Sequence, residues 1–145
     1  MRADAQRASI RRGTIALAVA ALALPGLAAA VDEEVHEYVE IALEHIEYAS
    51  AAADVEQKHE HLKHVINCLA GPEDDAYREE AANPCEGLGE GLVTALEPDR
   101  AFAPARGALL HIDAILQIED PDLSDMRIDE AQQALLQVRQ DLAAG

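Results

Sequence analysis

The residues of this chain with the greatest capacity for chemistry are gathered between positions 59 and 68. This stretch, HEHLKHVINC, holds three of the six histidines and one of the two cysteines. His61 and His64 are three residues apart, so on a helix their side chains share one face and both imidazoles can reach one metal ion. Imidazole is a suitable ligand for Cu, Zn and Ni. The spacing therefore indicates coordination of a transition metal.

Two amphipathic segments must position these histidines. Residues 32–53 and 54–70 both carry apolar side chains at steps of three and four, which is typical of helices with one buried face. Asp32 is expected to cap the first helix. Asp54 and Gln57 fit a capping box, which starts the second helix almost without a loop. The two helices are therefore predicted to form an antiparallel hairpin.

The hairpin brings a third histidine to the same height. With the turn centred between residues 53 and 54, His45 lies opposite Leu62, within one turn of His61 and His64. We therefore predict a metal site formed by His45, His61 and His64. Nearby side chains that could add a ligand are Glu44, Glu60 and Asn67.

A simpler explanation of the same histidines also exists. His45 would then be a partly buried core residue, and His61 and His64 would belong to a solvated polar face. The rotation of the second helix about its axis decides between the two explanations, because it sets whether His61 and His64 face the first helix.

The two cysteines bracket a long segment without helical periodicity. Residues 71–91 are rich in Gly, Pro, Asn and acidic side chains, with at most one short helical turn expected near residues 75–81. Loops of this length are uncommon unless they are functional or tied down. A disulfide between Cys68 and Cys85 would provide the tie in an exported protein. Cys68 could otherwise serve as a metal thiolate, four residues after His64.

The first 30 residues have the pattern of a cleavable export signal. Four arginines precede an apolar run from Ile15 to Leu24, and the alanines at 28–30 suit cleavage. The run is too short to span a bilayer. We therefore expect residues 31–145 to form a single domain in the periplasm or outside the cell, with no membrane attachment after cleavage.

The charge of the chain restricts its partners. The net charge is −17, and removal of residues 1–30 takes away four of 11 basic and one of 28 acidic side chains, which leaves 7 against 27 and a net charge of −20. Nucleic acids and anionic lipids are bound by clustered Lys and Arg, so neither is expected as a partner. Metal ions and basic proteins remain.

The composition favours an all-α fold. Aromatic residues make up 3% of the chain, and the β-branched and aromatic runs that mark strands are missing. Two further helices are expected at residues 104–118 and from residue 122 onward, with an apolar piece at 92–96 before them. We predict a four-helix bundle of two antiparallel hairpins with a long, disulfide-tethered central crossover.

Part of the first two helical segments resembles the small His-rich metal-binding proteins of the bacterial periplasm, which are helical bundles. The resemblance rests on residues 41–49, IALEHIEYA, and on ADV at 53–55, KH at 58–59 and LKH at 62–64. It implies divalent metal binding at His45, His59, His61 and His64. This chain differs in having fewer histidines, a cysteine pair and a long acidic crossover.

These features predict an exported, non-enzymatic protein that binds Cu, Zn or Ni for buffering, storage or delivery. Two alternatives stay open. One is an acidic adaptor that docks a basic protein without metal. The other is a bundle that holds haem non-covalently through His45 or His64 with His111, since the Cys-x-x-Cys-His motif for covalent attachment is missing.

Overall fold

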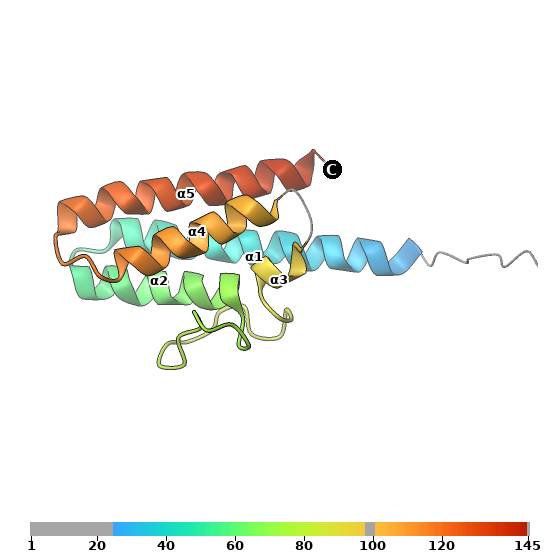
Figure 1. Ribbon diagram of the computed structural model, residues 1–145, viewed down its shortest axis with the longest axis horizontal. Coiled ribbons are helices and arrows are strands. Elements are labelled where there is room, and N and C mark those ends of the chain that lie inside the picture. The colour runs from blue at the N-terminus through green and yellow to red at the C-terminus, as the bar shows by residue number, and fades with distance from the viewer. Residues whose placement is uncertain (1–24, 98–100, 145) are drawn as a thin grey trace, which may run out of the picture.

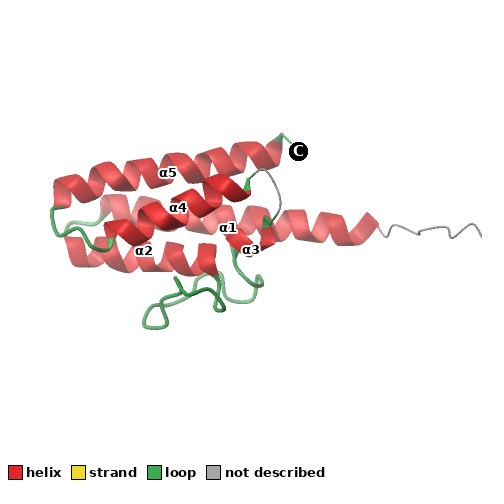
Figure 2. Ribbon diagram, in the orientation of Figure 1, coloured by secondary structure: helices red, strands yellow, loops and turns green. Residues whose placement is uncertain are grey.

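The protein is built from α-helices. The computed structural model describes residues 25–97 and 101–144, with side chains from residue 33 onward. Within these residues it contains five helices and no β-strand (Figure 2). They are α1 (Pro25–Ala51), α2 (Val55–Ala70), α3 (Leu92–Ala95), α4 (Phe102–Ile115) and α5 (Pro121–Ala143). The predicted all-α class is confirmed, and α3 is a short helix where only an apolar piece was expected.

The four long helices lie side by side in a bundle (Figure 1). α1 packs against α2 and α5, and α4 packs against α5 and α2. The core consists mainly of aliphatic and small side chains. Alanines at the contacts allow the helices to approach one another closely. The alanines that are completely buried among the described residues are Ala42, Ala49, Ala101, Ala105, Ala108 and Ala131.

α1 begins earlier than the sequence predicted. It starts at Pro25, so Asp32 lies inside the helix and the expected N-cap at Asp32 is wrong. Proline is well suited to a first helical turn, and the alanines at 28–30 are strong helix formers. The expected end of the export signal falls within α1, whose first turns extend beyond the bundle (Figure 1). The rest of that prediction lies in residues 1–24, outside the described residues.

No described helix combines the length and apolar character needed to cross a membrane.

Both ends of α2 follow the sequence prediction. Asp54 is the N-cap, and its carboxylate accepts a hydrogen bond from the backbone N–H of Gln57 at 2.9 Å. The Gln57 side-chain amide donates to the same carboxylate at 2.6 Å, whereas in a capping box its oxygen accepts from the backbone N–H of the cap. Gly71 ends the helix at a φ of 72°, a conformation that glycine adopts without strain.

The crossover from residue 71 to residue 91 contains turns but no helix, so the short helical turn considered near residues 75–81 is not present. Cys68 and Cys85 form a disulfide with a Cα–Cα distance of 5.1 Å. Asn67 is buried, and its amide donates to the carbonyls of Arg78, Ala81 and Ala82 at 3.0–3.3 Å. The same side chain accepts from the backbone N–H of Arg78 at 2.8 Å. These bonds hold the crossover against the end of α2.

The crossover is also attached to α4 and α1. Arg78 forms an ion pair with Asp113 on α4, and Arg106 on α4 pairs with Asp74 at 3.3 Å. The backbone N–H of Gly91 donates to the buried Tyr38 hydroxyl at 3.1 Å. The crossover therefore has contacts with three helices rather than extending freely into solvent.

The second pair of long helices has slightly shifted boundaries. α4 begins at Phe102 rather than at residue 104 and ends at Ile115. α5 begins at Pro121, because the Asp120 carboxylate caps it by accepting from the N–H groups of Asp122 and Leu123 at 3.0 and 3.1 Å. The apolar side chains of α5 recur at steps of three and four, and Ile128, Ala131, Leu135 and Val138 are completely buried.

Candidate metal centre

Three histidines converge between α1 and α2. One potential ligand atom from each of His45, His61 and His64 lies within 4.8 Å of the others. The ring centroids are 4.9 Å apart for His45 and His64, 5.7 Å for His45 and His61, and 5.9 Å for His61 and His64. The structure therefore brings together the three residues that the sequence selected, in a group that could hold a metal ion.

The closest pair already has the spacing of two metal ligands. Nδ1 of His45 and Nδ1 of His64 are 3.3 Å apart, which also allows a hydrogen bond when one nitrogen carries a proton. Two nitrogens bound at 2.0–2.1 Å to a tetrahedral zinc ion are separated by about 3.3–3.4 Å. At right angles on a square-planar ion, the same bond lengths give about 2.9 Å. The observed distance agrees with the tetrahedral edge.

The rotation of α2 places the histidines on this face. Leu62, Val65 and Ile66 are completely buried, so they direct one side of α2 into the core. His61 and His64 lie together along one edge of that buried side, about 60° apart around the helix. On α1, His45 lies beside the buried Ile46. All three imidazoles are half-buried, where a metal ion would be partly shielded from water.

Buried polar contacts hold α2 in this rotation. Lys58 is 3% exposed and forms an ion pair with Asp125 on α5. Asn67 and Cys68 attach the other end of α2 to the crossover. The Lys58 contact was not predicted, because Lys58 and Asp125 are 67 residues apart in the sequence and no local spacing relates them.

The surroundings of His45 and His64 favour their neutral forms. Burial lowers the pKa of His45 below the ordinary value of 6.5, and the proximity of His64 and His61 lowers it further, while Glu44 opposes the shift. Burial and then His61 likewise lower the pKa of His64. Only the neutral imidazole has a free electron pair for a metal, so this environment prepares both rings for coordination at neutral pH.

A histidine nitrogen without a hydrogen-bond partner also favours a metal site here. Nδ1 of His61 is buried and has no hydrogen-bond partner within the described residues. Leaving a buried polar atom without a partner costs free energy, about 1–3 kcal/mol. A metal ion, or a hydrogen-bonded ligand, would remove that cost.

The additional ligands considered from sequence have other partners. Glu44 accepts a hydrogen bond from the Tyr48 hydroxyl, and Glu60 pairs with Lys63 at 3.7 Å. Asn67 is occupied by the crossover backbone. Among the described residues, the group of close ligand atoms contains only the three histidines.

Tyr48 is a neighbour of the site that the sequence pattern did not single out. Its side chain is 45% exposed. Its ring centroid lies 5.6 Å from that of His45 and 5.4 Å from that of His61. The spacing of three residues between His45 and Tyr48 was the available signal, because it puts both rings on one face of α1.

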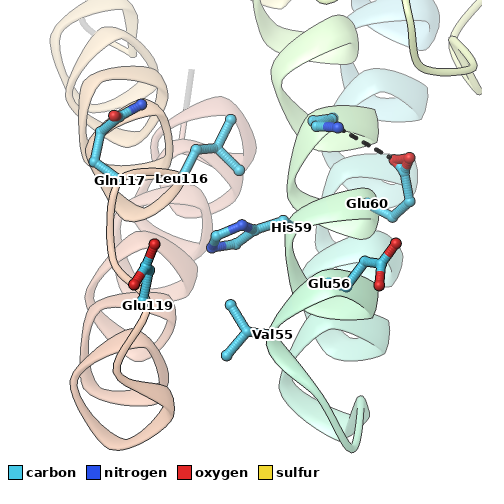
Figure 3. Close-up of a pocket in the computed structure, with 8 residues that line it drawn as sticks. Val55, Glu56, His59, Glu60, Leu116, Gln117 and Glu119 are labelled. Carbon is cyan, nitrogen blue, oxygen red and sulfur yellow. Dashed lines mark ion pairs between the residues drawn. The ribbon is translucent and has the colours of Figure 1, made fainter.

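His59 lies on another side of α2. In Figure 3 its ring points from α2 toward Leu116 at the end of α4. It contributes to the wall of a groove of ≈630 Å³, and its Nε2 atom is buried with no hydrogen-bond partner among the described residues. The groove is lined by Val55, Glu56, His59, Glu60, Lys63, Leu116, Gln117 and Glu119. The metal role that the resemblance implied for His59 is therefore not supported by contact with the other three histidines.

His111 is exposed on α4. It lines a separate hollow with Ala114, Ile115, Ile118 and Arg127, a set that includes none of the three converging histidines. The haem hypothesis needs His111 to pair with His45 or His64. This placement of His111 does not support such a pairing.

Comparisons with protein-family models, with curated proteins and with solved structures found no match to this chain. The case for a function therefore rests on the geometry and chemistry of the chain itself.

Proposed function

We propose that this protein is an exported, non-enzymatic helical bundle that binds a transition metal ion at His45, His61 and His64. Its role would be metal buffering, storage or delivery. The observation that carries the proposal is the convergence of three half-buried imidazoles, with their ligand atoms within 4.8 Å of one another. Lowered pKa values at His45 and His64 support it, because they keep both ligands neutral.

Among Cu, Zn and Ni, the geometry favours a tetrahedral ion. The 3.3 Å separation between the His45 and His64 nitrogens agrees with the edge of a tetrahedral Zn(II) site. Square-planar Cu(II) or Ni(II) would require these nitrogens to approach each other by a few tenths of an ångström. We therefore expect Zn(II) to bind with the least rearrangement.

The test is a metal titration of untagged protein by calorimetry, with elemental analysis of the purified material. The wild type is expected to bind one Zn(II) ion per chain near pH 7. A variant with His45, His61 and His64 all changed to Ala should lose this binding.

The matched control changes His36, His59 and His111 to Ala, which removes the same number of imidazoles from other places. It should bind the metal as the wild type does. Absence of binding in the wild type, or equal losses in both triple variants, would overturn the proposal.

The proposal includes an arrangement of two antiparallel hairpins and export from the cytoplasm. The most extensive helix contacts are those of α1 with α2 and of α4 with α5, which supports the two hairpins. The cysteine pair supports an oxidising compartment, because disulfides persist there. Mass analysis of the exported protein is expected to give a chain that begins near Val31.

A second candidate function is an acidic adaptor for a basic protein. Within the described residues, every Lys and Arg forms an ion pair with a carboxylate. The remaining carboxylates therefore carry unbalanced negative charge, consistent with the net charge of −17. Such a surface attracts cationic partners in a salt-dependent way.

This alternative is tested with metal-free protein. Capture of a basic protein from periplasmic extract that weakens with added salt, and is unchanged when the three converging histidines become Ala, would support the adaptor. Loss of that capture in the histidine variant would contradict it.

A further inference from the structure

A hollow adjoins the three converging histidines at the end of α1. It has a volume of ≈380 Å³ and is lined by Tyr48, Ala51, Ala52, Gln57 and His61. His61 belongs both to this wall and to the histidine group. Tyr48 lines the hollow and its ring lies within 5.6 Å of both His45 and His61, measured between centroids. The hollow is therefore next to the place where a metal would bind.

The histidine group leaves a metal ion incompletely coordinated. Among the described residues it supplies three ligands, whereas zinc sites closed by protein alone have four. Sites with three protein ligands keep the remaining position for water or an incoming molecule. Of the other candidates, Glu44 accepts a hydrogen bond from the Tyr48 hydroxyl, Glu60 pairs with Lys63, and Asn67 bonds to the crossover backbone.

From these observations we propose that the hollow admits a small external ligand that completes the coordination of the metal held by His45, His61 and His64. The ligand class is a compact anion or neutral donor with one nitrogen or oxygen ligand atom. The hollow has a volume of ≈380 Å³, so a compact ligand of this class fits beside His61. This inference rests on the proposed metal binding and concerns how the metal enters and leaves.

The chemical consequence is exchange of metal by ligand substitution. A donor that entered through the hollow would add a bond to the metal while His45, His61 and His64 still held it. Loss of one imidazole as a neutral ring would then restore the number of ligands, with no change in the oxidation state of the metal. Tyr48, which is half-exposed, forms part of the wall of the hollow.

The experiment uses full-length protein loaded with Co(II), a spectroscopic substitute for Zn(II), and titrates it with azide. We expect a saturable change in the visible absorption of the metal, because azide enters its coordination sphere. Changing Ala51 to Phe should place a ring in the hollow and abolish the azide response, while Co(II) affinity is retained. Ala51 is exposed at the end of α1, so the larger side chain does not enter the core.

The matched control is Ala53→Phe, which adds the same ring at an exposed position outside the hollow's wall. It should respond to azide as the wild type does. Co(II) binding without any azide response would overturn this inference alone, as would an undiminished response in Ala51→Phe. Failure to bind Co(II) or Zn(II) at all would overturn the proposed function and this inference with it.

Discussion

α2 carries histidines on two sides, and their surroundings differ. Toward α1, His61 and His64 meet His45, and three imidazoles converge. Toward α4, His59 stands in a groove with carboxylates and aliphatic side chains, without a second imidazole among its lining residues (Figure 3). His59 and His61 are two residues apart in sequence but about 160° apart around the helix. Helix rotation, rather than the density of histidines, therefore determines which of them can share a metal.

The sharpest test of this difference compares His61→Ala with His59→Ala. Structural zinc sites with four ligands bind with about 10–16 kcal/mol, or roughly 2.5–4 kcal/mol per ligand. Loss of His61 is therefore expected to weaken Zn(II) binding by about two to three orders of magnitude. His59→Ala should leave the affinity unchanged. Calorimetric titration measures both, and similar losses in the two variants would contradict the assignment of separate faces.

A second test removes the attachment of α2 to the crossover. Changing Cys68 and Cys85 to Ala opens a loop with a sequence separation of 17. In the chain-entropy model, a loop of this size contributes about 3 kcal/mol to the free energy of unfolding. Urea denaturation should report a loss of that size, with a smaller effect on Zn(II) affinity than His61→Ala causes. An unchanged urea midpoint would show that Asn67 and the ion pairs suffice to hold the crossover.

A third test concerns the other end of α2, where Lys58 pairs with Asp125. Asp125→Asn removes the negative charge and leaves a buried ammonium group without its counter-charge, at an expected cost of about 1–3 kcal/mol. Lys58→Met keeps the aliphatic packing and removes the buried charge, so its cost should be smaller. Urea denaturation of both variants provides the comparison. Equal stability of Asp125→Asn and the wild type would exclude this ion pair as a support of α2.

The smallest expected effect is the acid sensitivity of the metal-free protein. Burial lowers the folded-state pKa of His45 and His64, so below about pH 6.5 the unfolded chain takes up protons that the folded chain does not. The free energy of unfolding should therefore fall as the pH decreases from 6.5 toward the folded pKa values. The double variant His45→Gln/His64→Gln should show a shallower decrease in urea denaturation at several pH values. Parallel slopes would argue against the lowered pKa values.

Much of the fold followed from local patterns in the sequence. The apolar spacing in α1, α2 and α5 predicted their buried stripes, and Asp54 with Gly71 marked the ends of α2. These features depend on helix periodicity and on caps, which act within a few residues. The start of α1 was missed, because Asp32 has the chemistry of a cap but lies in a segment whose alanines also favour helix.

The sequence predicted which residues of α1 and α2 lie at the same level along the hairpin, but not the direction in which the histidine rings point. The short turn before Asp54 fixes which residues of α1 and α2 lie opposite each other, so the sequence alone selected His45, His61 and His64. Whether their rings converge depends on the rotation of α2. That rotation is set by core packing, by the Lys58–Asp125 pair and by the attachment of Asn67 and Cys68 to the crossover.

The sequence by itself thus determined the helical class, the boundaries of α2 and the three histidines, because each follows from spacing along one segment or across one short turn. Only the tertiary structure decided that His61 and His64 face His45, that His59 faces α4, and that a hollow beside Tyr48 adjoins the histidine group. These facts depend on contacts between segments far apart in the chain. No local pattern encodes them, since they arise from how the helices pack.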